Sequence, residues 1–179
     1  MPRTPPQKQR NELNQPMRLA YVALGANLAD PVAQVRAALE ALTRLPQSRL
    51  LRASSLYSSA PVGIRGQPDF INAVAAIETM LTPQAMLAAL FEVEEQFGRR
   101  RDFHHAPRTL DLDLLLVDGQ IIDSPQLQLP HPRMHLRAFV IAPLIEISPQ
   151  CRIPGRGHAA AWLPAVSMQA IERLNSREP

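Results

Sequence analysis

The most informative stretch of the chain reads PRTLDLDLLLVDG, from Pro107 to Gly119. Leucines at positions 110, 112 and 114 alternate with Asp111 and Asp113, so a β-strand would put the leucines on one face and both carboxylates on the other. The Cα atoms of the two acids would then lie roughly 6.6 Å apart. Carboxylates so placed suit one shared Mg²⁺ ion or a pair of ions. The alternative is a half-exposed strand whose outer face simply carries two acids.

Length and composition indicate a globular protein. A chain of 179 residues with 46% hydrophobic content can bury a substantial core. We expect residues 17–179 to form a single domain and the polar, proline-rich residues 1–16 to be a disordered tail without the apolar segment of a secretory signal. No apolar run reaches the length of a membrane helix, and the single cysteine, Cys151, suits the cytoplasm.

The positive charge is unevenly distributed along the chain. The sequence pI is about 9.7 and the formal net charge is +3, but the tail accounts for +2 of it through Arg3, Lys8 and Arg10 against Glu12. The remaining body carries only about +1, which is a weak electrostatic signal for nucleic-acid binding. Lys8 is the only lysine, so any phosphate bound by the body must contact arginine or histidine.

Basic side chains precede the acidic strand. Residues 99–108 hold four arginines, among them Arg101 and Arg108, against one aspartate. This local charge favours a small phosphorylated ligand, although arginine runs are often only a solvated surface. His131 and His135 have the four-residue spacing of metal ligands on a helix, but no third ligand is near in sequence. We therefore interpret His131 as a phosphate donor and expect no zinc site.

The order of expected elements predicts the fold class. Strands are expected over 19–24, 49–57 and 70–79, and helices start at Asp30-Pro31 and Thr82-Pro83 with N-cap and proline signals. Asp118-Gly119 predicts a type I′ hairpin leading into residues 120–122, and residues 167–174 predict a C-terminal helix. The order βαββαβ is that of a ferredoxin-like α+β fold, an antiparallel sheet with helices on one face, here with an extra β-hairpin and C-terminal helices.

Further residues predict a small-molecule site. The loop from Ser59 through Pro61 and Val62 alternates rigid and flexible residues, as either a pocket wall or an ordinary connection would. Phe70 and Asn72 share one strand face, where a ring and a carboxamide can bind a flat heterocycle, although Phe70 alone is typical of a core. Glu94 interrupts an apolar helix face and needs a ribose hydroxyl or an arginine as partner if it is buried.

Together these segments resemble the 6-hydroxymethyl-7,8-dihydropterin pyrophosphokinase family. The resemblance spans roughly residues 19–174. The matching blocks, in chain order, are Val22 to Leu28, Gln67 to Asn72, Gly98-Arg99, Pro107 to Asp113, Pro130-His131 and Arg137-Ala138-Phe139. The motif PRTLDLD at this place in a βαββαβ chain is highly specific for the family.

The resemblance implies an activity, its co-substrates and a set of site residues. The pterin hydroxyl would attack the β-phosphorus of ATP with AMP leaving, in folate biosynthesis, and two Mg²⁺ ions would be held by Asp111 and Asp113. The implied catalytic residues are Arg101, Arg108, Asp111 and Asp113. The implied ATP-binding residues are Glu94, Arg101, Arg108, His131 and Arg137. The implied pterin-binding residues are Ser59, Pro61, Val62, Phe70, Asn72 and Phe139, with the ring sandwiched between the two phenylalanines.

The chain departs from the family pattern at several positions. Ala26 stands where serine is common, and Phe70 replaces the more usual tyrosine. The arginine-rich loop is one residue short and reads His104-His105-Ala106 where the family usually has Arg-Trp-Gly. This altered loop leaves open a catalytically inactive relative with a binding role, and a ferredoxin-like nucleic-acid module is the other alternative. We expect a cytoplasmic monomer that acts on small molecules and binds neither nucleic acid nor membrane.

Overall fold

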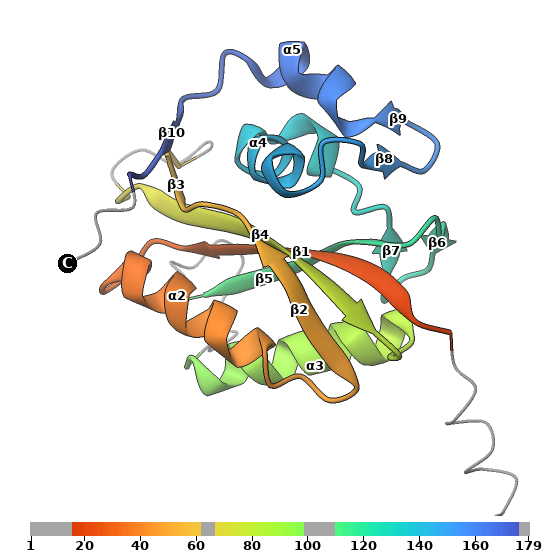
Figure 1. Cartoon of the computed structure of the whole chain (residues 1–179). Coiled ribbons are helices and arrows are strands. Elements are labelled where there is room, and N and C mark those ends of the chain that lie inside the picture. The colour runs from red at the N-terminus through yellow and green to blue at the C-terminus, as the bar shows by residue number, and fades with distance from the viewer. Residues whose placement is uncertain (1–15, 62–66, 99–109, 176–179) are drawn as a thin grey trace, which may run out of the picture.

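A computed structural model describes residues 16–61, 67–98 and 110–175 of the chain. Its centre is an antiparallel sheet in the order β10-β3-β4-β1-β5, with β2 paired to the other end of β4 (Figure 1). The strands are β1 (Arg18–Ala26), β2 (Ser48–Ala53), β3 (Tyr57–Ser59), β4 (Phe70–Thr79), β5 (Asp111–Val117) and β10 (Ile171–Arg173). The strand predicted over 70–79 is confirmed at both ends.

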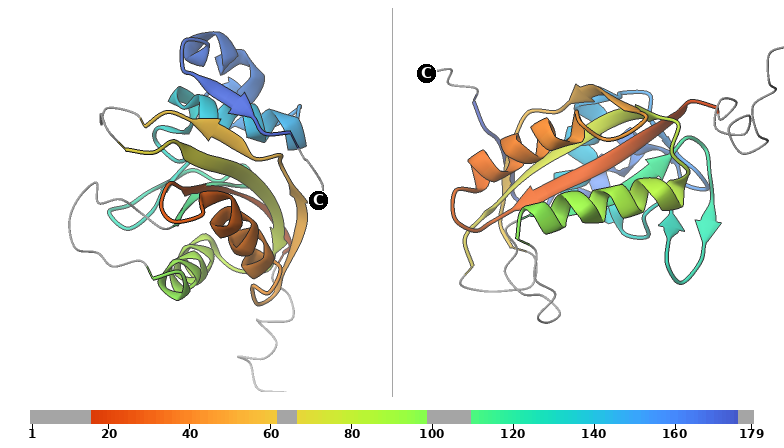
Figure 2. Two further views of the ribbon diagram at one scale, coloured as in Figure 1. Left: turned by 90° about the vertical axis from the view of Figure 1, so that its left-hand side faces the viewer. Right: turned by 90° about the horizontal axis from the view of Figure 1, so that it is seen from below.

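Two helices cover one face of the sheet, as Figure 2 shows from below. They are α2 (Pro31–Leu42) and α3 (Pro83–Gln96). Both begin as the sequence predicts, because the Asp30 and Thr82 side chains accept from N–H groups of the first turn, at 3.0 and 3.2 Å. Gly98, with φ of 78°, follows the end of α3. These features confirm the ferredoxin-like α+β fold.

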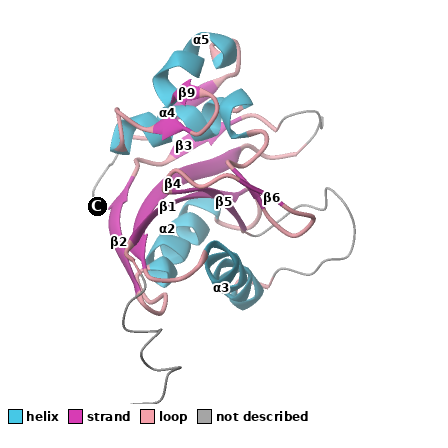
Figure 3. Ribbon diagram, turned by 90° about the vertical axis from the view of Figure 1, so that its right-hand side faces the viewer, coloured by secondary structure: helices cyan, strands magenta, loops and turns pink. Residues whose placement is uncertain are grey.

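A second layer covers the opposite face of the sheet (Figure 3). It consists of η1 (Met134–Leu136), α4 (Ala138–Ile147), the β8–β9 hairpin (Arg152–Ile153 and Gly157–His158), η2 (Ala159–Trp162) and α5 (Leu163–Val166). Alternate residues of β1 therefore enter different cores: Val22 and Leu24 pack towards α2 and α3, and Tyr21 packs towards α4. Burial on both faces explains why residues 71–77 are buried without alternation.

The strand expected over 49–57 is interrupted. It is divided into β2 and β3, which pair with different parts of β4. Between them, Ser54 N–H donates to Val74 O at 2.9 Å, and Ser54 Oγ accepts from Val74 N–H at 2.9 Å. A side-chain oxygen thus takes the place that a backbone carbonyl would have in a regular ladder. A serine in a strand-like segment gives no clear warning of this in the sequence.

The predicted Asp118-Gly119 hairpin is wrong. The short strand β6 (Ile122–Asp123) pairs with β7 (Gln128–Leu129) and not with β5. A type I′ turn needs positive φ at both central residues, and of these two only Asp118 has it, at 47°. Asp118 instead continues the ladder with β1: its N–H donates to Leu19 O at 2.7 Å, and its Oδ1 accepts from Leu19 N–H at 2.8 Å.

The predicted C-terminal helix over 167–174 is also wrong. The last helix, α5, ends at Val166, and residues 171–173 form β10 against β3. The Leu174 N–H continues this contact by donating to Leu56 O at 2.8 Å. Without β10, the three residues of β3 would be an open sheet edge, and pairing them outweighs the helical propensity of the segment.

Replacing Asp118 tests its contact with β1. We expect Asp118→Ala to lower the free energy of unfolding by about 1 kcal/mol, because the bond to Leu19 N–H is lost and alanine disfavours positive φ. Asp118→Asn should cost less, since it keeps the acceptor oxygen and tolerates this conformation. Urea denaturation measures both, with the exposed Asp123→Ala as control. Equal losses for alanine and asparagine would contradict the assigned contact.

Candidate active site

The alternation of β5 places its two acids on the face covered by α4. Leu112 and Leu114 belong to the core on the α2 and α3 side, as the sequence predicts. Asp111 and Asp113 therefore point to the opposite side, and both are only partly buried. The predicted face assignment is thus confirmed up to Leu114, beyond which a register shift in the pairing with β1 breaks the alternation.

A row of three residues crosses the sheet at the level of Asp111. Gly25 of β1 is directly opposite Asn72 of β4 on one side and Asp111 of β5 on the other. Cross-strand partners share a face, so Asn72 and Asp111 face the same side, two strand spacings or about 10 Å apart. Gly25 has no side chain to fill the space between them. A Cβ at this position would lie 3.4 Å from Asn72 Oδ1.

Asp113 lies close to two basic side chains. Arg137 Nη1, from the N-cap of α4, is 3.3 Å from Asp113 Oδ2, and His131 Nε2 is 3.8 Å from the same atom. Burial lowers the pKa of His131, and the Arg137 and Arg133 charges add to this, while Asp113 and Asp111 oppose it. Of the predicted phosphate-binding residues, the structure thus brings His131 and Arg137 together.

Glu94 does not join this cluster. It comes from α3, on the other face of the sheet, and is 1% exposed. Its Oε1 accepts from the Leu112 N–H at 2.7 Å, so the carboxylate contacts the backbone of β5 between the two acids. The sequence predicted a ribose hydroxyl or an arginine as its partner, and not this backbone N–H. Its predicted role in ATP binding stays a prediction.

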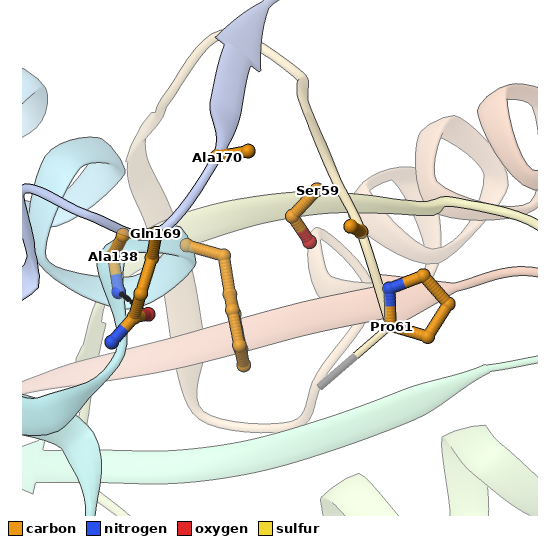
Figure 4. Close-up of a pocket in the computed structure, with 7 residues that line it drawn as sticks. Ser59, Pro61, Ala138, Gln169 and Ala170 are labelled. Carbon is orange, nitrogen blue, oxygen red and sulfur yellow. Dashed lines mark hydrogen bonds between the residues drawn. The ribbon is translucent and has the colours of Figure 1, made fainter. Parts of the chain in front are cut away.

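A cavity of about 180 Å³ lies next to the start of α4 (Figure 4). Its lining includes three of the predicted pterin-binding residues, Ser59, Pro61 and Phe139. The remaining lining residues are Ala60, Ala138, Gln169 and Ala170. The Arg137 guanidinium carbon lies 5.6 Å from the centre of the Phe139 ring, so the cavity adjoins the Asp113 cluster.

Asn72 connects the cavity to the sheet. Asn72 is 4% exposed, and its Nδ2 donates to Ser59 Oγ at 2.9 Å and to Phe70 O at 3.3 Å. Asn72 and Phe70 lie on the same strand face, as predicted, but neither lines the cavity. The stacking of a ring between Phe70 and Phe139 stays a prediction. Val62, Arg101 and Arg108 lie outside the described residues.

His131 and His135 do not form a pair. His135 is buried, its Nε2 is 3.1 Å from Arg156 Nη1, and its ring packs edge-on against Trp162 at 4.5 Å between centroids. Burial and the Arg156 charge lower the pKa of His135. Within residues 16–61, 67–98 and 110–175, no group of three histidine, cysteine or acidic residues could hold a metal ion.

The donor set nevertheless fits magnesium. Mg²⁺ is often bound through one or two carboxylates, with water and phosphate oxygens completing its coordination. Asp111 and Asp113 supply two hard oxygen donors on one face, with partial solvent access. Such a pair beside basic side chains and a small cavity defines a class of site, that of an enzyme acting on a phosphorylated small molecule.

Comparison with known proteins identifies the family. Residues 21–149 match the family model described as 7,8-dihydro-6-hydroxymethylpterin-pyrophosphokinase (HPPK). The 2-amino-4-hydroxy-6-hydroxymethyldihydropteridine pyrophosphokinase of Pseudomonas aeruginosa is 49% identical over 154 residues, which cover 86% of this chain and 95% of that protein. The enzyme of the same name from Haemophilus influenzae is 47% identical over 138 residues, 77% of this chain and 86% of that protein. The chain therefore belongs to the HPPK family.

A solved structure agrees at the level of the fold. A Plasmodium falciparum HPPK-DHPS chain matches with a TM-score of 0.69 at 14% identity. The match covers 86% of this chain but only 46% of that longer one. At this identity the likeness concerns the fold alone.

Sequence reasoning did not assign four of the cavity-lining residues to the site, and the one among them with a polar side chain is Gln169. It lines the cavity, and its carboxamide contacts the backbone at the start of α4. No motif or periodicity distinguishes this glutamine from the chain's other glutamines. Only the folded chain brings it to a helix that begins 31 residues earlier.

The buried His135 should make stability depend on pH. Its folded-state pKa lies below the ordinary 6.5, so below that pH the unfolded chain binds a proton that the folded chain excludes. The free energy of unfolding should therefore be fully retained above about pH 7 and fall as the pH drops from about 6.5 towards the folded-state pKa. Urea denaturation at several pH values should show a smaller fall for His135→Gln. An unchanged pH dependence in this variant would contradict the assignment.

Proposed function

We propose that the two carboxylates of β5 are the centre at which this chain transfers diphosphate from ATP to 6-hydroxymethyl-7,8-dihydropterin. The transfer is the activity of the HPPK family, a step of folate synthesis. The proposal concerns how this chain performs it. The observation that carries it is the placement of Asp111 and Asp113 on one sheet face, with Arg137 and His131 against Asp113 and Asn72 across Gly25 from Asp111.

The reaction needs positioning more than covalent help from the protein. The hydroxymethyl oxygen of the pterin forms a bond to the β-phosphorus of ATP, the bond from that phosphorus to the α,β-bridging oxygen breaks, and AMP leaves. The hydroxyl proton is released in the process. An enzyme accelerates such a step by holding the two reactants in line and neutralising phosphate charge. The row from Asn72 to Asp111 puts the residue that we assign to the pterin and a residue that we assign to the phosphates on one surface.

The phosphate side consists of the acids and the basic residues around them. Asp111 and Asp113 would hold two Mg²⁺ ions, which neutralise the triphosphate charge when bound. Arg137 and His131 are 23% and 19% exposed in their side chains, so both can still contact a ligand. Arginine suits this task because its planar fork matches phosphate oxygens. We extend the same role to Arg101 and Arg108, and nucleotide contact to Glu94, on the family resemblance.

The pterin side consists of the cavity and the sheet surface beside it. Ser59, Pro61 and Phe139 provide the cavity wall. The Nδ2 of Asn72 is already bound to Ser59 Oγ, so Oδ1 is the group we assign to the amino edge of the pterin. A buried amide that reads one heterocycle discriminates against analogues that leave it unpaired. Phe70 and Val62 complete the proposed pterin site.

The setting of the enzyme is also a proposal. We infer a cytoplasmic monomer that works on small molecules alone. Burial raises the pKa of the Cys151 thiol to about 11, so this cysteine is predominantly protonated near neutral pH. No helix in the described part of the chain is long and apolar enough to cross a membrane.

The carboxylates can be tested directly. We expect Asp111→Ala and Asp113→Ala each to lower turnover at least about a hundredfold. Each change removes a ligand of the Mg²⁺ ions that would neutralise the triphosphate charge. The assay follows nucleotide products by chromatography, with the pterin present. Asp123→Ala, on the short strand β6, is the matched control and should keep full activity. Release of ADP by the wild type would refute diphosphate transfer, and near-normal activity of either β5 variant would refute the role of that acid.

Gly25 tests whether the space between Asn72 and Asp111 is used. Gly25→Ala should be tolerated, since the new Cβ would only touch Asn72 Oδ1 at 3.4 Å. Gly25→Val fills the space and should raise the KM for the pterin by about tenfold or more, with a smaller effect on the KM for ATP. Steady-state kinetics measure both, and circular dichroism checks the fold. A valine variant with unchanged pterin KM would exclude Gly25 from the binding surface.

A further inference from the structure

The helix that carries Arg137 lacks a cap of its own. Helix N-termini are usually capped by a short polar side chain that accepts from N–H groups of the first turn. The N-cap of α4 is Arg137, whose side chain makes no cap bond and extends to Asp113 at 3.3 Å. The first free N–H, that of Ala138, instead donates to Gln169 Oε1 at 2.9 Å. Figure 4 shows these two residues side by side.

The same carboxamide makes a second bond on the other side of Arg137. Gln169 Nε2 donates to Leu136 O at 2.8 Å. The Leu136 carbonyl and the Ala138 N–H belong to the two peptide planes that flank the Cα of Arg137. One side chain therefore binds both peptide planes whose rotation sets φ of −123° and ψ of 113° at Arg137. It adds to the backbone bonds of the same planes, in which Arg137 N–H donates to Met134 O at 3.4 Å and Arg137 O accepts from Ile141 N–H at 3.0 Å.

Gln169 is itself held in place. It is half-buried, and its N–H donates to Val166 O at 3.0 Å. Two residues later β10 begins, where Ile171 pairs with Ser59 of the cavity wall. Because the backbone is anchored on both sides, the carboxamide can act as a rigid brace.

The other end of α4 has separate anchors. Glu146 accepts from Ser55 N–H at 3.1 Å and from Tyr57 Oη at 2.8 Å, and it pairs with Arg173 at 3.3 Å. Ile141 and Leu144 are fully buried against the sheet. Loss of the Gln169 bonds should therefore loosen the first turn of α4 and leave the helix in place.

We propose that Gln169 is a positioning residue for Arg137: it fixes the backbone from which the guanidinium reaches Asp113 and, in the proposed reaction, the ATP phosphates. The role in ATP binding rests on the proposed function, whereas the brace itself does not. Residue 169 lies beyond the 21–149 segment that matches the family model.

The test is a double-mutant cycle with Arg137. Gln169→Leu keeps the approximate size of the side chain and removes both bonds. Two measurements are made: kcat/KM for ATP, and calorimetric binding of a non-hydrolysable ATP analogue with Mg²⁺. We expect each to fall about tenfold in Gln169→Leu. In an Arg137→Gln background the further loss should be less than about twofold, since Gln169 acts through Arg137. The neighbouring Met168→Ala, at 95% exposure, is the control and should change neither quantity.

Additive effects in the cycle, or normal binding and kinetics in Gln169→Leu, would overturn the proposal. If Gln169→Leu fails to fold, Gln169→Glu takes its place, because it keeps the acceptor for Ala138 N–H and loses only the donor to Leu136. It should show a smaller loss with the same dependence on Arg137, and additivity would again overturn the proposal. The binding arm of the cycle reports on the brace even if the wild type released no AMP, so failure of the proposed function would be recognised separately.

Discussion

The candidate site depends on the register of β1 with its two neighbours. This strand pairs with β4 on one side and β5 on the other, so it fixes how the residues of those two strands face each other. A slip by one residue in either pairing would turn one half of the site to the opposite face. Burial on both faces opposes such a slip, because Val22 and Leu24 fill one core while Tyr21 fills the other.

The layer on the α4 side adds the basic and aromatic groups. Arg137 and Phe139 lie at the start of one helix, so the contact with Asp113 and the cavity wall move together. The start of that helix is fixed from a distant segment, and its end is fixed by Glu146. The position of the site thus depends on how α4, the segment around Gln169 and the segment that contacts Glu146 pack against the sheet. In the proposed mechanism, residues 169–173 therefore affect the chemistry assigned to the central strands.

Local signals predicted the parts of the structure that local interactions decide. The bounds of β4, the caps of α2 and α3 and the face of Asp111 and Asp113 follow from patterns within a few residues. The errors occur where a distant partner decides. Asp118 takes part in the β1 ladder instead of a hairpin, and residues 171–173 pair with β3 instead of extending a helix. Gln169 escaped notice for the same reason. Arg101, Arg108 and Val62, proposed from the family resemblance, lie outside the described residues.

The central claim is that Asp111 and Asp113 bind the metal that accompanies the nucleotide. Manganese can replace magnesium, and its anomalous X-ray scattering locates it without ambiguity. A crystal structure of the protein with Mn²⁺, a non-hydrolysable ATP analogue and the pterin alcohol tests the claim most directly. Our account predicts anomalous peaks within coordination distance of both carboxylates, on the α4 face of β5. Peaks held only by other residues, or a bound nucleotide without metal beside these acids, would contradict it.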